Sequence, residues 1–565
     1  MIRDFKHPHF AGLIFLALIP FCFFLNILPC GAATGSKIAA VTSDPRATQA
    51  AIEVLEKGGT AVDALVTAQA VLNVVAPQSS GITGGAALLY YDSALRRILY
   101  FDGAVLSPSG FSRDLFLRPV SYQELRKSGI SSGVPGVPKL LAEVHSRYGS
   151  GRFSFAELLE SAAVMAENGV TVSEELAEAL QSDMGELAVQ PHFRSVFFKN
   201  GILVRAGDKI LQPDLARTLR LIQKKGWEVF YKGELATAVV KTAQEALPLS
   251  GKISPGDMGS YSVEKRSALY GVYRGYDVFT ASPPSASGLL FLQSCNILNR
   301  FDVSGYAGRP EAIHLVAETI KNASSADAKI GDPDIFDLPV AEFVSEEWTR
   351  RQAEKIDLNR ASRSARKTEG QTPVSKQLTA SILIADRNGN VVNYSSSLGD
   401  AFGTGRIIPG TGLFLNNLLL GFDRDASLIS DPDFPNAPAP GQRPKNYFAP
   451  VLVLKDGRPV LSLNASDGPE SFVTNLNVFL QRTDFKVPCE GVLEIPRVFN
   501  RPEGMVIEKQ LYDEEVWRVQ LELWGHKVHA RDFLGNGQMI CFETDSGRMI
   551  AESDLRGDTY GAAAI

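Results

Sequence analysis

Few residues in this chain could hold a metal ion or a framework of disulfides. Its 565 residues include five cysteines and seven histidines, and neither C-x-x-C nor H-E-x-x-H spacing occurs. The pattern therefore indicates neither a disulfide scaffold nor a zinc site. His526 and His529 lie three residues apart with no third ligand evident nearby, so we interpret them as a surface pair. We expect no metal and no cofactor.

The cysteines are too scattered to define a pairing. Three of them, Cys295, Cys489 and Cys541, follow the N-terminal region. One disulfide could form among these three, but the sequence does not show which two would pair. The simpler interpretation of each is a small buried apolar residue.

The chain also lacks the marks of nucleic-acid and nucleotide binding. Its formal net charge is −6, no run of five or more Lys or Arg occurs, and there is neither a Walker loop nor a G-x-S-x-G elbow. A mildly acidic chain without a basic run does not resemble a nucleic-acid binder. With 45% apolar and 21% charged residues, the composition is globular and excludes a wholly disordered or fibrous chain.

The N-terminus has the order of a targeting segment. Arg3 and Lys6 precede an apolar run from Ala11 to Leu28, and small residues follow up to Ala33. This order is typical of a secretory signal and predicts cleavage near Ala33, which makes 1–33 the signal peptide. An uncleaved membrane anchor ranks second, and lipid modification of Cys30 ranks third. We expect an exported protein, either periplasmic or extracellular.

The first half of the chain is predicted to be mainly helical. Helical patterns continue from Gly136 to about Asn322, after an early hairpin. The segments concerned are the helices Ala47–Glu56, Ala61–Val75, Phe155–Asn168, Pro213–Lys225 and Glu311–Asn322, and the hairpin strands Ala87–Tyr91 and Ile98–Phe101.

A polar linker separates this half from a region rich in strands. Residues 360–378 carry five Lys or Arg and little that could be buried, which predicts an exposed linker. The apolar run Ala380–Ala385 and the Ser-rich run Val391–Leu398 then flank Asn388-Gly389, a strong hairpin signal. Two similar strand pairs follow, so we expect strands in hairpins with helices on both sides.

One hydroxyl stands where the linker meets the buried strand. If the bond between Leu378 and Thr379 were broken, Thr379 would gain an α-amine with an ordinary pKa of roughly 7.7–8.0. That amine could take the proton from the residue's own hydroxyl, so Thr379 would supply both nucleophile and base. On spacing alone, a β-branched residue opening a strand is the simpler interpretation of Thr379, and an ordinary strand that of Ser395, Ser396 and Ser397.

Several segments resemble the γ-glutamyltranspeptidase (gamma-glutamyltransferase, glutathione hydrolase) family, and the likeness extends from about Ala39 to Tyr560. The matching segments are Ala47 to Ala64, Ser132 to Gly136, Phe230 to Gly233, Tyr273 to Tyr276, Pro283 to Gly288, Gly331 to Pro333, Phe402 to Gly405 and Leu415 to Asn417. The resemblance implies an α+β fold, the four-layer αββα sandwich of the N-terminal-nucleophile hydrolases. It also implies a precursor that cuts itself into a large subunit, 34–378, and a small subunit, 379–565.

The resemblance assigns roles to three residues. The family's nucleophile begins the small subunit seven residues before the Asp of a D-x-[DN]-G-N hairpin, and counting back from Asp386 gives Thr379. The cut would therefore separate Leu378 from Thr379. Ser397 falls where the family has a second hydroxyl, a Thr, that bonds to the nucleophile. Gly468 falls on the first glycine of the family's oxyanion pair, while the second position is Pro469, which has no N–H; Asp467 could shift this register by one.

The acyl-binding pocket departs from the family pattern. The family's carboxylate-binding Arg is replaced by Ala104, and the two serines that assist it are replaced by Asn446 and Tyr447. The positions that bind the substrate's amino group fall on Gly399, Leu418 and Gly421. Losing paired partners for a zwitterion costs several kcal/mol, hence orders of magnitude in selectivity. We expect an apolar or aromatic pocket formed by Leu418, Tyr447 and Phe448, with Arg424 or Arg443 as the evident replacement cations.

Three functions follow from these observations. The first is an exported, self-processing amidohydrolase or acyltransferase of this family, acting on γ-glutamyl amides of the glutathione type, with a diverged pocket. The second is an acylase for a non-glutamyl amide. The third is a pseudoenzyme that serves as a binding or structural protein. The expected partners are a small-molecule amide and the two subunits of one precursor, without nucleic acid.

Overall fold

The computed structural model describes residues 32–182, 187–362, 378–425, 431, 433–501, 503–556 and 561–565. Nearly all of the predicted signal peptide and most of the predicted linker lie outside these ranges. The predicted cleavage site near Ala33 falls within β1 (Ala32–Gly35), and it stays a prediction. No helix in the described ranges is both long and apolar enough to cross a bilayer.

Two seven-stranded sheets dominate the described residues. The first has the order β1-β20-β19-β15-β14-β11-β10 and the second β21-β2-β12-β13-β3-β4-β9, with neighbours antiparallel throughout. The bounds in the first sheet are β20 Arg548–Ser553, β19 Gly537–Glu543, β15 Arg458–Ala465, β14 Val451–Lys455, β11 Tyr276–Thr280 and β10 Leu269–Tyr273. Those in the second are β21 Ala562–Ala564, β2 Ala39–Thr42, β12 Leu378–Ala385, β13 Val391–Gly399, β3 Gly85–Asp92, β4 Arg97–Gly103 and β9 Glu264–Arg266.

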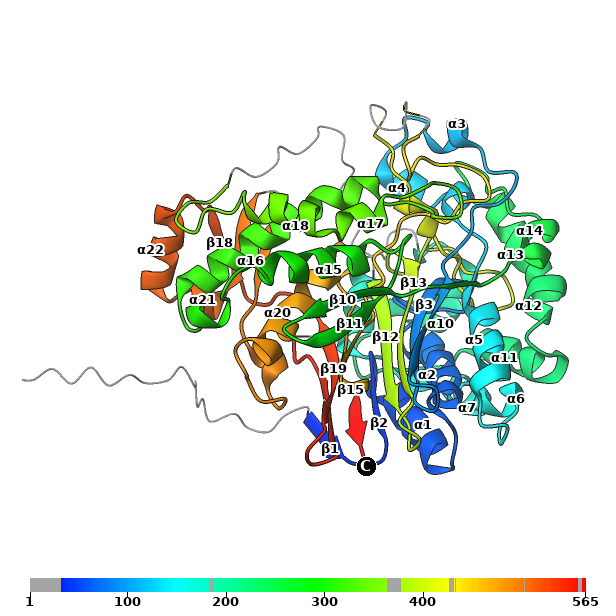
Figure 1. Cartoon of the computed structure of the whole chain (residues 1–565). Helices are drawn as coiled ribbons and strands as arrows, with labels where there is room; N and C mark the ends of the chain where they lie inside the picture. The colour runs from blue at the N-terminus through cyan, green and yellow to red at the C-terminus, as the bar shows by residue number, and fades with distance from the viewer. Residues whose placement is uncertain are drawn as a thin grey trace, which may run out of the picture. The chain divides into compact units, whose positions relative to one another are not determined.

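The sheets face each other across an apolar layer. Leu383 of β12 shares this layer with Leu452 of β14 and Ile540 of β19. The opposite face of β12, with Ile382 and Ile384, packs in a core with the helices α1 and α2. A third core joins the first sheet to the helices α15 (Ala286–Leu298), α16 (Pro310–Ala323) and α20 (Ser471–Thr483). Figure 1 shows the helices lying outside the strands. The two sheets and the helices packed on their outer faces form the four layers that the family resemblance implied.

The sequence explains the most buried helix directly. α2 (Ala61–Val75) is buried at every position, as its almost continuous apolar composition predicted. Thr60 caps its start, with its side chain accepting from the Asp63 N–H while the Asp63 carboxylate accepts from the Thr60 N–H. The pair satisfies backbone donors that a helix start leaves without partners.

The remaining elements surround these layers. The longer helices are α1 (Pro45–Glu56), α5 (Val137–Tyr148), α7 (Glu160–Asn168), α8 (Glu174–Ser182), α10 (Pro191–Phe197), α11 (Pro213–Lys225), α13 (Glu234–Glu245), α15 (Ala286–Leu298), α16 (Pro310–Ala323), α18 (Glu346–Ala353), α20 (Ser471–Thr483) and α22 (Glu515–Leu523). The shorter ones are α3 (Arg113–Phe116), α4 (Tyr122–Arg126), α6 (Phe155–Leu158), α12 (Val229–Lys232), α14 (Pro255–Ser260), α17 (Val340–Phe343) and α21 (Lys509–Tyr512). A small sheet joins β16 (Val498–Arg501), β17 (Gly504–Glu508) and β18 (Val528–Arg531), and the two-stranded pairs are β5 (Val170–Thr171) with β8 (Lys209–Ile210) and β6 (Phe198–Lys199) with β7 (Ile202–Leu203).

Four local expectations need correction. The stretch expected to be helical contains the hairpin β10–β11, and the helix expected at Phe155–Asn168 divides into α6 and α7 at Leu159. Cys489 and Cys541 form a disulfide rather than lying as separate buried thiols, and Cys295 is free and buried. His526 is only 7% exposed, so it is not a surface residue, whereas His529 is exposed.

Candidate active site

Thr379 is the second residue of β12 and lies opposite Ser397 of β13. The pairing register shifts between Leu378 and Thr379, because Leu378 pairs with Gly399. Thr379 is 7% exposed. Side chains alternate along a strand, so Thr379 shares a face with Ser381 and Leu383, the face that looks toward the other sheet.

Ser397 contacts the peptide bond that precedes Thr379. Its Oγ donates a hydrogen bond of 2.6 Å to the carbonyl oxygen of Leu378 and accepts one of 2.9 Å from the N–H of Gly399. The first bond draws electron density from the Leu378 carbonyl, and the second fixes the hydroxyl that makes it. A carbonyl polarised in this way is more open to nucleophilic attack, which is the chemistry that this arrangement can support.

Buried amides hold the two sheets together next to this pair. Asn464 of β15 donates from Nδ2 to the Ser395 Oγ at 2.9 Å and to the Asn393 Oδ1 at 2.8 Å. Asn393 in turn donates to the carbonyl of Leu463 at 2.8 Å. Sequence reasoning missed both residues, although a single Asn within an apolar strand is a signal of such a contact.

Gly468 lies four residues after Asn464, at the start of a short turn that leads into α20. It is buried and has a φ of +58°, a conformation that glycine adopts at little cost. The Asp467 N–H donates to the Ser471 Oγ at 2.9 Å. The turn therefore presents Gly468, which keeps an N–H, next to Pro469, which has none.

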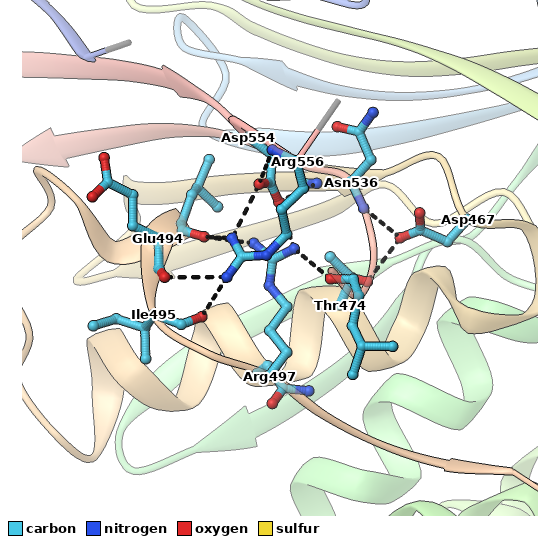
Figure 2. Close-up of polar contacts among 12 residues, drawn as sticks. Asp467, Thr474, Glu494, Ile495, Arg497, Asn536, Asp554 and Arg556 are labelled. Atoms are coloured by element: carbon cyan, nitrogen blue, oxygen red, sulfur yellow. Dashed lines mark hydrogen bonds and ion pairs between the residues drawn. The ribbon is translucent and has the colours of Figure 1, made fainter. Parts of the chain in front are cut away.

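A polar network supports this turn from behind. The Asp467 carboxylate accepts from the Thr474 hydroxyl at 2.7 Å and from the Asn536 N–H at 3.0 Å. Burial raises the pKa of the Asp467 carboxyl to about 6, against these bonds and the charge of Arg497. Figure 2 shows the same network, in which Arg497, 1% exposed, forms an ion pair with Asp554.

Ala104 directly follows β4, which is separated from Ser397 on β13 by the strand β3. Gly85 of β3 pairs with Ser397, and a Cβ placed on Gly85 would stand 3.2 Å from the Ala104 Cα. The Ala104 N–H donates to Asp102 at 3.0 Å, and its carbonyl accepts from the Tyr261 hydroxyl at 2.7 Å. No charged side chain is contributed by this position.

The two arginines considered as replacements are engaged elsewhere. Arg443, 4% exposed, has carboxylate oxygens of Asp102, Asp334 and Glu264 within 3.5–3.7 Å, and it shares Asp102 with Arg266. Arg424 donates to the carbonyl of Arg118 at 3.1 Å, and burial lowers the pKa of its guanidinium. The acidic residues around Arg443 offset its charge, so it is not an open receptor for a substrate carboxylate.

The positions where the family binds the substrate's amino group have no room for polar side chains. A Cβ on Gly399, whose φ is +102°, would lie 2.0 Å from the Asn417 Oδ1. One on Gly421 would lie 2.4 Å from the Lys445 carbonyl oxygen. Leu418 is 6% exposed and packs with Phe111, Phe116 and Phe422. This side of the site is therefore filled by backbone and apolar packing.

Asn446 and Tyr447 contact the start of α15. The Asn446 carbonyl accepts from the Ala286 N–H at 2.8 Å, and the Tyr447 carbonyl accepts from the Ser287 hydroxyl at 3.0 Å. The Tyr447 hydroxyl lies 3.3 Å from both carboxylate oxygens of Asp327. The structure thus brings Leu378, Thr379 and Ser397 together, whereas the Tyr447 hydroxyl is committed to Asp327.

Comparison with known proteins finds matches that cover most of the chain. The family model described as Gamma-glutamyltranspeptidase matches residues 47–564. The chain is 30% identical to the glutathione hydrolase proenzyme of Bacillus subtilis (strain 168), covering 92% of this chain and 90% of that protein. It is 29% identical to the acylase ACY 1 proenzyme of Pseudomonas sp. (strain SE83), covering 93% of each.

Solved structures of two related proteins superpose on this chain. The crystal structure of cephalosporin acylase from Bacillus halodurans superposes with a TM-score of 0.83 at 23% identity, over 100% of this chain and 99% of that one, which shows the fold. Helicobacter pylori gamma-glutamyltranspeptidase superposes with a TM-score of 0.55 at 29% identity, over 58% of this chain and 93% of that one. The family match over most of the sequence and the shared fold together show that this chain belongs to the gamma-glutamyltranspeptidase family of hydrolases.

Proposed function

We propose that this protein is an exported amidohydrolase that cuts its own chain before Thr379 and then uses Thr379 as an N-terminal nucleophile. The observation that carries the proposal is the 2.6 Å hydrogen bond from the Ser397 hydroxyl to the Leu378 carbonyl oxygen. A hydroxyl fixed on the carbonyl just before a candidate nucleophile is what self-cleavage requires, because negative charge develops on that oxygen during attack.

The cut would proceed in two balanced steps. The Thr379 Oγ1 attacks the Leu378 carbonyl carbon, the C–N bond breaks, and the proton lost by the hydroxyl is gained by the released nitrogen. Water then hydrolyses the resulting ester, which leaves a carboxylate on Leu378 and restores the Thr379 hydroxyl. The freed α-amine lies on the same residue as the nucleophile. The two products would be the segments that end at Leu378 and begin at Thr379.

The mature residue would hydrolyse an external amide by the same chemistry. The α-amine of Thr379 takes the hydroxyl proton as Oγ1 attacks the substrate carbonyl, and it returns a proton to the leaving amine. Water releases the acyl group from the ester. In this scheme the Gly468 N–H stabilises the oxyanion, since Pro469 has no proton to donate.

The acyl group that best fits the site is not a γ-glutamyl zwitterion. Ala104 supplies no charge, Gly399 and Gly421 have no room for a side chain, and acidic residues offset Arg443. A zwitterion would lose its hydration without gaining these partners. Because 30% and 29% identity link the chain to a glutathione hydrolase and to an acylase alike, the relatives do not decide between the two activities.

Paired assays test the proposal. Mature protein is given a γ-glutamyl anilide and a series of anilides with neutral, apolar acyl groups, and initial rates are compared. We expect saturable turnover of at least one apolar substrate with kcat/KM at least about a hundredfold above the γ-glutamyl compound, since a misplaced acyl carbonyl costs about that factor.

Two other outcomes would favour the alternatives. Efficient turnover of the γ-glutamyl compound alone would restore γ-glutamyl hydrolysis or transfer of the glutathione type. Turnover of no substrate, with Thr379 shown by N-terminal sequencing to be free, would favour a processed binding protein. Sequencing of the exported large segment would also test the predicted signal cleavage near Ala33.

A further inference from the structure

Three buried side chains that the proposed chemistry does not use converge between α16 and the turn after α22. They are His314, Glu318 and His526, and one donor atom from each lies within 4.8 Å of the others. His314 and Glu318 are 0% exposed and His526 is 7% exposed. The fold therefore places two further side chains of metal-binding type beside His526, from a part of the chain far away in sequence.

A backbone contact selects the tautomer of a neutral His314 imidazole. Its Nε2 lies 2.7 Å from the Asp357 carbonyl oxygen. Because a carbonyl only accepts hydrogen bonds, Nε2 carries the proton and Nδ1 carries a lone pair. That Nδ1 lies 2.7 Å from the His526 Nε2. An imidazole that donates one N–H to a backbone carbonyl and presents its other nitrogen is the arrangement common to metal-binding histidines.

Glu318 completes the group from the same helix. It follows His314 by four residues, so imidazole and carboxylate lie on one face of α16. Its Oε1 accepts from the Lys321 ammonium at 2.7 Å and its Oε2 from the Ser362 N–H at 3.2 Å. Each carboxylate oxygen has a second lone pair, so these contacts orient the carboxylate and still leave it able to bind an ion.

We propose that His314, Glu318 and His526 bind a divalent ion of the zinc type. Two neutral imidazoles and one carboxylate suit zinc, whereas magnesium and calcium prefer oxygen ligands alone. Zinc–nitrogen bonds of about 2.0–2.1 Å around a tetrahedral ion place the two nitrogens roughly 3.3 Å apart, so the rings separate by about half an ångström. The ion replaces the hydrogen bond between the histidines, and His526 then carries its proton on Nδ1.

The site would join the two segments of the proposed cut. His314 and Glu318 precede Thr379, and His526 follows it. Ser362, which contacts Glu318, is the last described residue before 363–377. The ion would therefore hold together a segment from each side of the cut. Binding itself does not require the cut, so the site stands or falls independently of the proposed function.

The test measures metal bound by the full-length protein. Protein stripped with a chelator is incubated with Zn²⁺, freed of excess ion and analysed by elemental mass spectrometry, with Mg²⁺ in a parallel sample. We expect about one zinc ion per chain and no retained magnesium. With Co²⁺ as the probe, we expect visible absorption bands of a tetrahedral site.

Matched variants identify the ligands. Glu318→Gln and His526→Gln should each weaken zinc binding at least about tenfold, while His529→Gln should bind like wild type. His529 is a suitable control because it lies three residues from His526 and is exposed. Zinc should also raise the melting temperature of wild type and His529→Gln but not of Glu318→Gln.

Two results would overturn the site. One is wild-type protein that retains no zinc and shows no shift in melting temperature. The other is wild-type protein and Glu318→Gln that retain equal amounts of zinc. Glu318→Gln keeps the shape of the side chain, so the comparison remains decisive even if a histidine variant fails to fold.

Discussion

The Ser397 hydroxyl donates a 2.6 Å hydrogen bond to the carbonyl oxygen of Leu378, although 19 residues separate the two along the chain. The hairpin of β12 and β13 brings the two residues together, at the place where the pairing register shifts between Leu378 and Thr379. The same hairpin places the Thr379 side chain on the face between the sheets. One local element therefore places the peptide bond that we propose is cut, the proposed nucleophile Thr379 and the hydroxyl of Ser397.

The first prediction concerns maturation. Thr379→Ala should remain a single uncut chain, because it lacks the attacking oxygen. Ser397→Ala should cut at least about a hundredfold more slowly, since losing one donor to a developing oxyanion costs about that factor. Gel electrophoresis over time and intact mass measure both effects.

Ser395→Ala is the matched control for Ser397→Ala. It removes a hydroxyl two residues away on the same face of β13, one that bonds Asn464 rather than Leu378. Ser395→Ala should cut at close to the wild-type rate. A fast cut in Ser397→Ala, or wild-type protein that stays whole after long incubation, would contradict the role given to this hydrogen bond.

The second prediction concerns Gly399, on the side of the site that is filled by backbone and apolar packing. Gly399→Ala should lower the free energy of unfolding by about 2–4 kcal/mol, because the methyl group would overlap Asn417 and the backbone has a positive φ. Gly457→Ala is the control, since Gly457 has a φ of +72° and nothing within 4 Å of an added Cβ. It should cost only about 1 kcal/mol. Equal losses in urea unfolding would show that side chains fit at position 399.

The third prediction concerns pH. Burial raises the pKa of Glu552 to about 7, and among the described residues no hydrogen bond reaches its Oε2. Because its pKa is raised on folding, the folded protein binds the Glu552 proton more tightly than the unfolded chain does. This contribution to the free energy of unfolding is complete below pH 4.5, and it is lost as the pH rises through 7. As the pH rises from 4.5 to 8, the free energy of unfolding of Glu552→Gln should therefore increase by about 1–3 kcal/mol relative to that of wild type.

Glu543→Gln provides the opposite sign. Hydrogen bonds from Arg548 lower the pKa of Glu543 below its ordinary value near 4.5. The free energy of unfolding of wild type should therefore increase relative to that of Glu543→Gln as the pH rises toward 4.5. Denaturant unfolding at several pH values measures both differences. A Glu552→Gln curve parallel to wild type would mean that Glu552 titrates at its ordinary pKa.

The fourth prediction concerns the disulfide. Cys489 and Cys541 close a loop across a sequence separation of 52 residues. The double variant Cys489→Ser/Cys541→Ser should lower the free energy of unfolding by about 3–4 kcal/mol, through the larger freedom of the unfolded chain. Reducing agent should lower the free energy of unfolding of wild type by a similar amount and should not change that of the double variant. Cys295→Ala, which removes the free thiol, should keep the response to reducing agent.

Patterns local in sequence were readable before the structure. The apolar run Ala380–Ala385, the Asn388-Gly389 turn and the apolar helix Ala61–Val75 predicted the right elements. The family resemblance predicted the layers, and its assignment of Thr379 as the nucleophile stays a prediction. The hairpin β10–β11 was missed because its turn is Arg274-Gly275, with φ values of +51° and +78°, rather than the common Asn-Gly. A non-glycine residue with positive φ leaves little trace in composition.

Contacts between distant segments could not be read from spacing. His314 and His526 are 212 residues apart, so no local pattern joins them. The same holds for the acidic residues around Arg443, which come from three different stretches of the chain. The closed space at Gly399 depends on Asn417, and the sequence shows that a glycine is present but not what fills the space beside it.

Both large sheets combine strands that precede Thr379 in the chain with strands that contain or follow it. In the second sheet, β2 lies between β21 and β12, and in the first, β11 follows β14. Neither part could assemble half of a sheet without leaving long unpaired edges. We therefore expect the chain to fold before the proposed cut, and we expect protein cut before Thr379 not to refold once its strands have separated. For such a protein, thermal unfolding would be irreversible. The lifetime of the folded state would then be set by the rate of unfolding rather than by an equilibrium between folded and unfolded chains.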